Sequence, residues 1–320
     1  MGYKESTPMK TFTLLFLLAC LLPAQTDFPP LSSKPVANWP HLPPAWNFRE
    51  TPGIAADPRG HVFVIHRGEH PIMEFDPEGK FVRAFGDTLF DRAHAVRFDP
   101  EGNLWAVDDG SHVVMRLDAE GHVKMVLGRY RKPGDSVTPA HPGPRGIRDE
   151  DVLLFNRPTD VAFAPNGDFY VSDGYGNSRV VKFSKDGRFL KTWGTKGAAP
   201  GQFNTPHSVA VDKQGHVYVA DRENYRIQIF DANGEFLKQW THVGAPWGLY
   251  ITPDQTLFMC DGYNNRVLKL NLEGRILGGF GSPGKRPGEL SYVHNLSVGP
   301  DGAIYTAEIL NWRPQKFVMR

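Results

Sequence analysis

The chain repeats one pattern of apolar and polar positions six times. Each copy begins with a turn signal such as Pro-x-Gly, followed by a short run in which apolar and polar residues alternate, as in residues 61–65 and 103–107. Alternation with a period of two residues is typical of a β-strand with one buried face. The third residues of successive turn signals are 42, 65, 48, 40 and 47 residues apart. These turn positions are Gly60, Gly102, Gly167, Gly215, Gln255 and Gly302.

Each copy then continues in the same way. Six residues after the turn position stands a residue that is acidic in five of the six copies. In chain order these residues are His66, Asp108, Asp173, Asp221, Asp261 and Glu308. A third strand follows, and a second turn such as Asp186-Gly187 leads to a fourth strand. Four strands at this period form one propeller blade, so the sequence predicts an all-β fold, a six-bladed β-propeller spanning residues 51–320.

The two ends of the repeat array predict how the ring closes. The sixth copy stops after its third strand, residues 314–319. We therefore expect the N-terminal segment, residues 26–50, to close the last blade, with the missing outer strand between residues 37 and 48. Closure removes the sheet edges that would otherwise promote aggregation. The 65-residue interval contains an insertion near residues 131–151, rich in Pro, Gly and charge, which we expect to form a surface loop.

The N-terminus resembles a secretory signal. Met9-Lys10 precedes an apolar run at residues 12–22, and Pro-Ala-Gln follows it. The run is too short to span a bilayer, so we expect residues 1–25 to be a signal peptide, with Met9 as an alternative start. Export to the periplasm or the exterior follows. Cys20 lies in a Leu-Leu-Ala-Cys sequence similar to a lipoprotein box, and lipid anchoring there is the less favoured alternative.

Composition narrows the function classes. The formal net charge is +1, which favours neither nucleic acid nor an anionic membrane as a partner. Without the signal peptide one cysteine remains, Cys260, and it lies within an apolar run. We expect Cys260 to be a buried core residue, the core to hold without disulfides, and the mature chain to be a monomer without a transmembrane segment.

One position in the repeat carries the candidate chemistry. The residues eight positions before the turn positions are Pro52, His94, Thr159, His207, Trp247 and His294, so histidine occupies the second, fourth and sixth copies. Alternate blades of a six-fold ring are related by rotations of about 120° around the axis. Three imidazoles would therefore converge there, which is the ligand set of catalytic zinc sites with an open fourth position. Copper, iron and nickel also accept imidazole, and separately satisfied core histidines are the structural alternative.

Three further residues are expected on the same face. Arg67 and Arg222 share the position that follows the recurring acidic residue, and arginine binds carboxylates in a bidentate manner. Tyr175 lies two residues beyond Asp173, and a tyrosine beside a metal and an arginine can have a lowered pKa and act as a base. The alternatives are salt bridges between the arginines and the recurring acidic residues, and rim packing for Tyr175. Tyr263 shares the position of Tyr175 and is assigned no role.

These residues carry a family resemblance. From about residue 39 onward the chain resembles the peptidyl-α-hydroxyglycine α-amidating lyases, which are NHL-repeat propellers. The resemblance rests on residues 63–68, 172–179, 206–208 and 220–224. It implies that His94, His207 and His294 are zinc ligands.

The resemblance also assigns the remaining site residues. It makes Tyr175 the base, Arg67 its electrostatic partner and Arg222 a substrate-binding residue. It further implies a structural calcium on the axis, held by the backbone carbonyls of Ile54 and Val96 and by an aspartate after the third histidine.

This chain has Asn295 at that last position, so we expect calcium to bind weakly or not at all. The activity implied is cleavage of N-acyl-α-hydroxyglycine substrates, small molecules or peptides with a carboxylate, to an amide and glyoxylate.

Two other functions stay open at this stage. The chain could be a non-catalytic NHL propeller that binds a peptide, a glycan or an envelope protein. It could also be a metal-dependent, lactonase-like hydrolase. Hydrolases of that kind rely on Glu, Asp and Asn ligands, whereas the predicted axis offers imidazoles.

Overall fold

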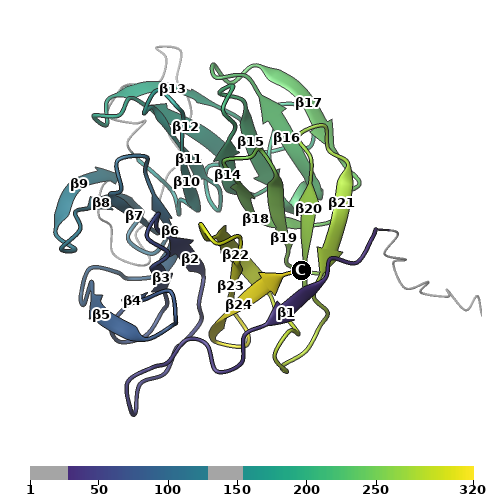
Figure 1. Cartoon of the computed structure of the whole chain (residues 1–320). Coiled ribbons are helices and arrows are strands. Elements are labelled where there is room, and N and C mark those ends of the chain that lie inside the picture. The colour runs from purple at the N-terminus through teal and green to yellow at the C-terminus, as the bar shows by residue number, and fades with distance from the viewer. Residues whose placement is uncertain (1–27, 129–153) are drawn as a thin grey trace, which may run out of the picture.

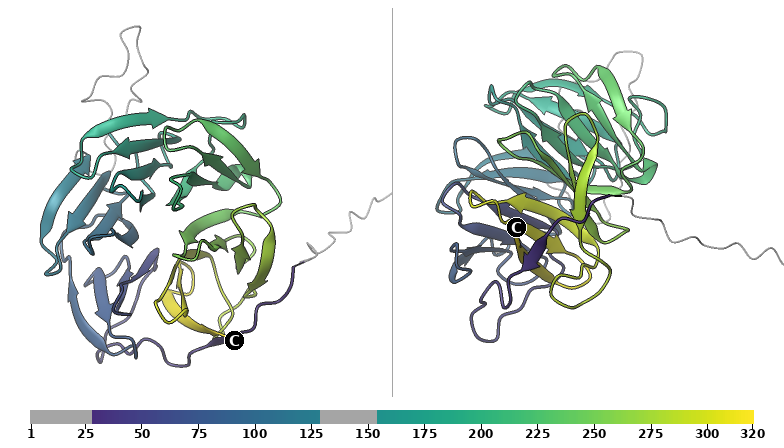
Figure 2. Two further views of the ribbon diagram at one scale, coloured as in Figure 1. Left: turned by 45° about the horizontal axis from the view of Figure 1, so that its top comes forward. Right: turned by 45° about the vertical axis from the view of Figure 1, so that its right-hand side comes forward.

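The computed structural model describes residues 28–128 and 154–320. The expected signal peptide, with Met9 and Cys20, and the insertion at residues 131–151 lie outside the described residues. Within them, 24 strands and one short 3-10 helix, η1 (Arg222–Asn224), form six four-stranded antiparallel sheets arranged in a ring (Figures 1 and 2). The prediction of an all-β, six-bladed propeller is confirmed. No described helix is long and apolar enough to cross a membrane.

Each blade runs from its innermost to its outermost strand. Blade one comprises β2 (Gly53–Ala56), β3 (Val62–Ile65), β4 (Ile72–Phe75) and β5 (Phe81–Phe85), and blade two β6 (Ala93–Phe98), β7 (Leu104–Asp108), β8 (Val113–Leu117) and β9 (Val123–Gly128). Blade three comprises β10 (Asp160–Phe163), β11 (Phe169–Asp173), β12 (Arg179–Phe183) and β13 (Phe189–Trp193), and blade four β14 (Pro206–Val211), β15 (Val217–Asp221), β16 (Arg226–Phe230) and β17 (Phe236–Trp240). Blade five comprises β18 (Pro246–Ile251), β19 (Leu257–Asp261), β20 (Arg266–Leu270) and β21 (Ile276–Phe280), and blade six β22 (Val293–Val298), β23 (Ile304–Glu308), β24 (Arg313–Met319) and β1 (Ser33–Pro35).

The hydrophobic core is distributed between neighbouring blades. Strands two and three of a blade are almost wholly buried, whereas outer strands such as β17 are mostly exposed. Apolar side chains of adjacent blades interleave; for example, Trp105 of blade two packs with Phe169 of blade three. Cys260 is fully buried in the cluster between blades five and six, as expected. Burial of this kind contributes about 25 cal/mol per Å² of apolar surface, which explains a core without disulfides.

The ring closes through the N-terminal segment, but not at the expected residues. β1 pairs with β24 in the order Ser33↔Met319, Lys34↔Val318 and Pro35↔Phe317. The outer strand therefore precedes the predicted range of residues 37–48. Within that range Asn38 and Ala45 have positive φ angles, which interrupt an extended strand. Its apolar residues Trp39 and Phe48 instead fill the core between blades six and one.

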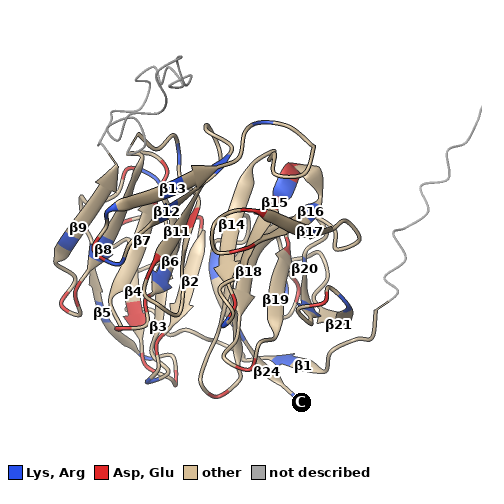
Figure 3. Ribbon diagram, turned by 90° about the horizontal axis from the view of Figure 1, so that it is seen from above, with Lys and Arg blue, Asp and Glu red and all other residues tan. Residues whose placement is uncertain are grey.

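The recurring acidic residue fixes the entry to each inner strand. Asp221 accepts hydrogen bonds from the backbone N–H of Asn204 (2.7 Å) and from Arg226 Nε (2.7 Å), and Glu308 accepts equivalent bonds from Ser291 N (2.9 Å) and Arg313 Nε (3.0 Å). These acids thus tie the second and third strands to the segment just before the histidine position. Seen from above in Figure 3, basic and acidic positions are mixed around the ring.

Candidate metal centre

Each of the three histidines lies at a break in its strand pairing. The register of β6 against β7 shifts between Ala93 and Ala95, so that His94 has no partner on β7. The same shift occurs around His207 in β14 and around His294 in β22. An unpaired residue of this type redirects its side chain, and such bulges are common beside active sites. The bulges therefore turn the three imidazoles toward the axis.

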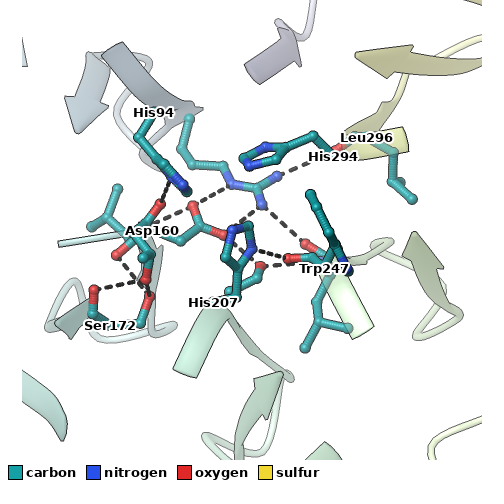
Figure 4. Close-up of polar contacts among 12 residues, drawn as sticks. His94, Asp160, Ser172, His207, Trp247, His294 and Leu296 are labelled. Atoms are coloured by element: carbon teal, nitrogen blue, oxygen red, sulfur yellow. Dashed lines mark hydrogen bonds and ion pairs between the residues drawn. The ribbon is translucent and has the colours of Figure 1, made fainter. Parts of the chain in front are cut away.

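The three histidines form one buried cluster on the axis. Their ring centroids lie 4.7 to 4.9 Å apart, and one ring nitrogen from each lies within 4.8 Å of the others. None of the three residues is more than 3% exposed. Figure 4 shows the rings of His94, His207 and His294 reaching one space from three separate blades. The predicted convergence of the alternate histidines is thus present in the structure.

The intervening blades orient the imidazoles through their backbone. Nδ1 of His94 donates to the carbonyl of Thr159 (2.6 Å), Nδ1 of His207 to that of Trp247 (2.7 Å), and Nδ1 of His294 to that of Pro52 (2.7 Å). Blades two, four and six thus supply the rings, and blades three, five and one supply the acceptors. A hydrogen bond of this kind fixes both the tautomer and the ring orientation of a metal-binding histidine.

The donor set fits a soft or borderline divalent metal. Burial, followed by repulsion from neighbouring histidines and arginines, holds the pKa of all three imidazoles well below the usual value. They are therefore neutral at physiological pH, with the hydrogen on Nδ1 and a lone pair on Nε2. Three convergent, dehydrated lone pairs are costly without a cation and match the imidazole preference of zinc.

Tyr175 contacts this cluster directly. Its hydroxyl lies 3.0 Å from Nε2 of both His94 and His207. Because both nitrogens are acceptors, the single phenolic hydrogen satisfies one of them only. Burial raises the pKa of Tyr175, and Arg222 is the strongest opposing influence. In the protein alone, loss of hydration therefore outweighs the nearby arginine; the lowered pKa expected beside a metal concerns the metal-bound protein.

Arg67 and Arg222 both lie near the cluster. Arg67 Nε donates to the carbonyl of Ala93, next to His94 (3.0 Å), and Arg222 Nε donates to Glu223 (2.7 Å). The Arg222 guanidinium lies 5.5 Å from the ring centroid of Tyr175. Salt bridges with the recurring acidic residues were the alternative. Four of those acids instead pair with arginines of the third strands, as in Asp173 with Arg179, and Asp108 bonds Ser111.

Comparison with known proteins identifies relatives of the chain. The NHL repeat model matches residues 155–183 and 203–230. A peptidyl-glycine alpha-amidating monooxygenase of Xenopus laevis is 33% identical over 208 residues, which cover 55% of this chain and 22% of that protein. A peptidyl-alpha-hydroxyglycine alpha-amidating lyase of Drosophila melanogaster is 26% identical over 222 residues, covering 60% of this chain and 50% of the relative.

The chain is a homologue of the peptidyl-α-hydroxyglycine α-amidating lyases. It spans half or less of the length of these relatives. In structure, a streptogramin B lyase matches with a TM-score of 0.61 at 16% identity, covering 91% of this chain and 98% of the other, a likeness that concerns the fold alone.

The chain also has polar residues beside the cluster that were not predicted from the sequence. Asp109 is buried and forms ion pairs with Arg92 and with Arg157 Nη2 (2.9 Å). Arg157 lies over the ring of Tyr175, 4.8 Å from its centroid. Asp109 could have been found from the sequence, because it occupies the same repeat position as Arg67 and Arg222. We call Arg67, Arg92, Asp109 and Arg157 the cationic half of the rim.

The opposite side of the rim in this homologue is aromatic. Trp247 shares the repeat position of the histidines, and its ring centroid lies 5.5 Å from those of His207 and His294. Tyr292 stacks on Trp247 at 5.3 Å, and Tyr263 meets it edge-on at 5.2 Å. We call Trp247, Tyr263 and Tyr292 the aromatic half.

Two contacts connect the aromatic half to Arg222. The Tyr263 hydroxyl donates to Glu223 (3.0 Å), which in turn holds Arg222. Tyr263 therefore has a role that its sequence position did not reveal. Arg222 marks the border of the two halves, because its guanidinium also lies 4.7 Å from the Trp247 ring centroid.

The residues expected to hold calcium lie deeper on the axis. Ile54 and Val96 are fully buried in β2 and β6, and Asn295 in β22 is 4% exposed, with no hydrogen-bond partner for its Oδ1 among the described residues. Near them lies a buried ion pair, Arg97 with Asp160. Burial would lower the pKa of Arg97, but attraction and hydrogen bonds from Asp160 outweigh it and raise that pKa, so the guanidinium is charged.

Proposed function

We propose that this protein is a zinc-dependent carbon–nitrogen lyase that cleaves N-acyl-α-hydroxyglycine-type substrates to an amide and glyoxylate. The observation that supports it is the Tyr175 hydroxyl, which lies 3.0 Å from two Nε2 atoms of the histidine cluster, with Arg67 and Arg222 alongside. Cleavage of an α-hydroxylated amide needs a Lewis acid, a base and a cationic site for the carboxylate. The imidazoles would hold the Lewis acid, Tyr175 offers the base and the arginines offer the cationic site, and homology to amidating lyases favours this assignment.

The histidines are the residues that would hold the metal. His94, His207 and His294 would bind zinc through Nε2, since each Nδ1 is committed to a carbonyl. A bound zinc ion would supply Lewis acidity toward the substrate hydroxyl and would lower the pKa of the adjacent phenol. This explains why burial alone need not keep Tyr175 protonated in the active protein.

Tyr175 would move the proton. Its Oη atom accepts the proton of the substrate hydroxyl, and the carbon–oxygen bond becomes the carbonyl of glyoxylate. The carbon–nitrogen bond breaks, and its electron pair leaves with the nitrogen. That nitrogen takes up a proton from Tyr175, which gives the amide and restores the phenolate. No oxidant or reductant is required.

The two halves of the rim would orient the substrate. Arg67 and Arg222 would bind the carboxylate that becomes part of glyoxylate, because guanidinium groups pair with carboxylates through two parallel hydrogen bonds. The N-acyl group would then point toward Trp247, Tyr263 and Tyr292, whose flat apolar surfaces favour an apolar acyl substituent. An anionic substrate with an apolar acyl group is the class that both halves accept together.

The test is a glyoxylate assay combined with metal analysis. Purified protein should contain about one zinc per chain and should release glyoxylate from N-benzoyl-α-hydroxyglycine. His207→Ala should lose both properties, while His242→Ala, which changes a histidine bonded to the Gly274 carbonyl outside the cluster, should retain both. Equal glyoxylate release by wild type and His207→Ala would contradict the proposal. Absence of stoichiometric transition metal would favour the non-catalytic binding propeller, and calcium-dependent lactone hydrolysis would favour the hydrolase.

A further inference from the structure

A second polar cluster lies on the propeller axis, below the histidines. Arg97 Nε and Nη2 bind the two carboxylate oxygens of Asp160 at 3.0 and 2.7 Å, and both side chains are almost fully buried. The guanidinium also donates to two backbone carbonyls, those of Leu296 (3.3 Å) and Leu249 (3.1 Å). Figure 4 shows Asp160 and Leu296, two partners of Arg97, in the same close-up as the three histidines.

The cluster joins most of the ring. Arg97 belongs to blade two, Asp160 to blade three, and the two carbonyls to blades five and six. Ser208 of blade four donates to Asp160 Oδ2 (2.5 Å), and its Oγ accepts the backbone N–H of Leu249 (3.0 Å). One buried cation and its carboxylate thus connect five of the six inner strands.

The carbonyls that Arg97 binds belong to a ring of equivalent positions. Leu249 and Leu296 each lie six residues before their turn positions, and Ile54 and Val96 occupy the same position in blades one and two. The carboxylate shows the same correspondence, because Asp160 and Asn295 both lie seven residues before their turns. Two carbonyls and the carboxylate at this level of the axis therefore already bind a cation, and its negative partner lies in blade three instead of blade six.

We infer that the guanidinium of Arg97 is the permanent axial cation of this propeller and takes the place of a structural calcium ion. A divalent cation at the level of Ile54, Val96 and Asn295 would face a positive charge that cannot be released by deprotonation. The only described carboxylate of this level, Asp160, is fully committed to Arg97, Ser208 and the backbone N–H of Val161 (2.9 Å). Asn295 offers a neutral oxygen, which is insufficient for calcium without a carboxylate.

The inference does not depend on the proposed lyase activity. It concerns the full-length protein and is tested by thermal unfolding with calcium chloride or with EGTA. The melting temperature of the wild type should be the same in both, and dialysed protein should contain no stoichiometric calcium. One tightly bound calcium per chain, or a calcium-dependent rise of several degrees in the wild type, would overturn it.

A substitution should convert the axis into a calcium site. Arg97→Met leaves Asp160 and the two carbonyls without a cation, and should lower the melting temperature by about 10 °C, as expected for one broken partner of a buried ion pair. Calcium should recover a substantial part of this loss, because a carboxylate and backbone carbonyls are its preferred ligands. Arg97→Met with Asp160→Asn should show no recovery.

Two controls keep the test decisive. Arg266→Met removes an equivalent arginine from an ion pair with Asp261 that lies outside the axis, and its loss of stability should not respond to calcium. Arg97→Lys keeps a positive charge and should stay insensitive to calcium even if Arg97→Met fails to fold. Calcium stabilisation of Arg97→Lys or of Arg266→Met equal to that of Arg97→Met would overturn the assignment of the effect to the axis.

Discussion

The two halves of the rim around the histidine cluster differ although they come from the same repeat. The position two residues before the histidine position holds Arg92 and Arg157 in blades two and three, and Tyr292 in blade six. Arg157 and Arg222 both lie over the Tyr175 ring, whereas Trp247 and Tyr292 stack beside His294. The comparison shows that the repeat provides three equivalent histidines. Residues at the rim that differ between the copies make the two sides of the cluster chemically different.

The strongest test removes the atom between the two halves. Tyr175→Phe keeps the ring and deletes only Oη, the proposed proton acceptor. We expect kcat for glyoxylate release to fall by about 10²- to 10⁴-fold with little change in zinc content. Steady-state kinetics and elemental analysis of the same preparation provide the measurement. A wild-type value of kcat in this variant would show that Tyr175 is not the proton acceptor.

His66, next to Arg67 of the cationic half, should make the stability of the fold sensitive to acid. His66 stands where other copies carry an acidic residue, and its Nδ1 accepts the backbone N–H of Arg49 (3.2 Å). Burial lowers the pKa of His66 to about 4 from 6.5. The unfolded chain therefore binds the proton more strongly, so stability present above pH 6.5 is lost as the pH falls toward 4, by about 3 kcal/mol.

Denaturant unfolding at several pH values measures this loss. The histidine cluster contributes in the same direction, because its pKa values are also depressed. His66→Gln isolates the share of His66, since glutamine cannot be protonated. An identical pH dependence of unfolding in wild type and His66→Gln would show that His66 does not contribute to the loss of stability in acid.

Removing one arginine should weaken the cationic half uniformly. Arg67→Met deletes a charged hydrogen-bond donor next to the cluster, and we expect kcat/KM to fall by about 10- to 100-fold. The loss should be similar for N-acetyl and N-benzoyl substrates, because both carry the same carboxylate. A loss confined to one acyl group would place Arg67 against the acyl end and reverse the proposed orientation.

The aromatic half should discriminate between acyl groups. Tyr263→Ala removes an exposed ring beside Trp247, and should lower kcat/KM by about tenfold for N-benzoyl substrates with a smaller effect on N-acetyl substrates. Tyr263→Phe keeps the ring and loses the hydrogen bond to Glu223, so it should retain the acyl preference. Equal effects of Ala on both substrates would indicate that the ring acts only through Glu223 and Arg222.

The parts of the site that follow the repeat could be predicted from the sequence. The spacing of the turn signals predicts the six blades. The alternating histidines are found by counting eight residues back from each turn position. The carbonyl acceptors could not be predicted, because Pro52, Thr159 and Trp247 share no side-chain property and act through their backbone. The repeat position of Asp109 could have indicated its place beside the cluster. Its residue type could not, because acidic residues recur throughout the chain.

Long-range packing explains the other differences. The outer strand at Ser33–Pro35 was missed because Trp39 and Phe48 are typical strand residues, yet they fill the core between blades six and one. The raised pKa of Tyr175 reflects burial, which only the folded ring creates. The pair Arg97–Asp160 was also missed, because each residue occupies an ordinary position in its own blade and the interaction exists only across the axis.

The pairing of β1 with β24 has a consequence for the time course of folding. Among the described strands β1 is synthesised before the others and β24 after them, so β1 must wait, unpaired, until the strands of the other blades have been made. Contacts this distant in sequence form slowly, because the entropy of closing so long a loop is lost before the contacts form. The histidine cluster draws one ligand from blade six and would therefore mature only when the last strand arrives.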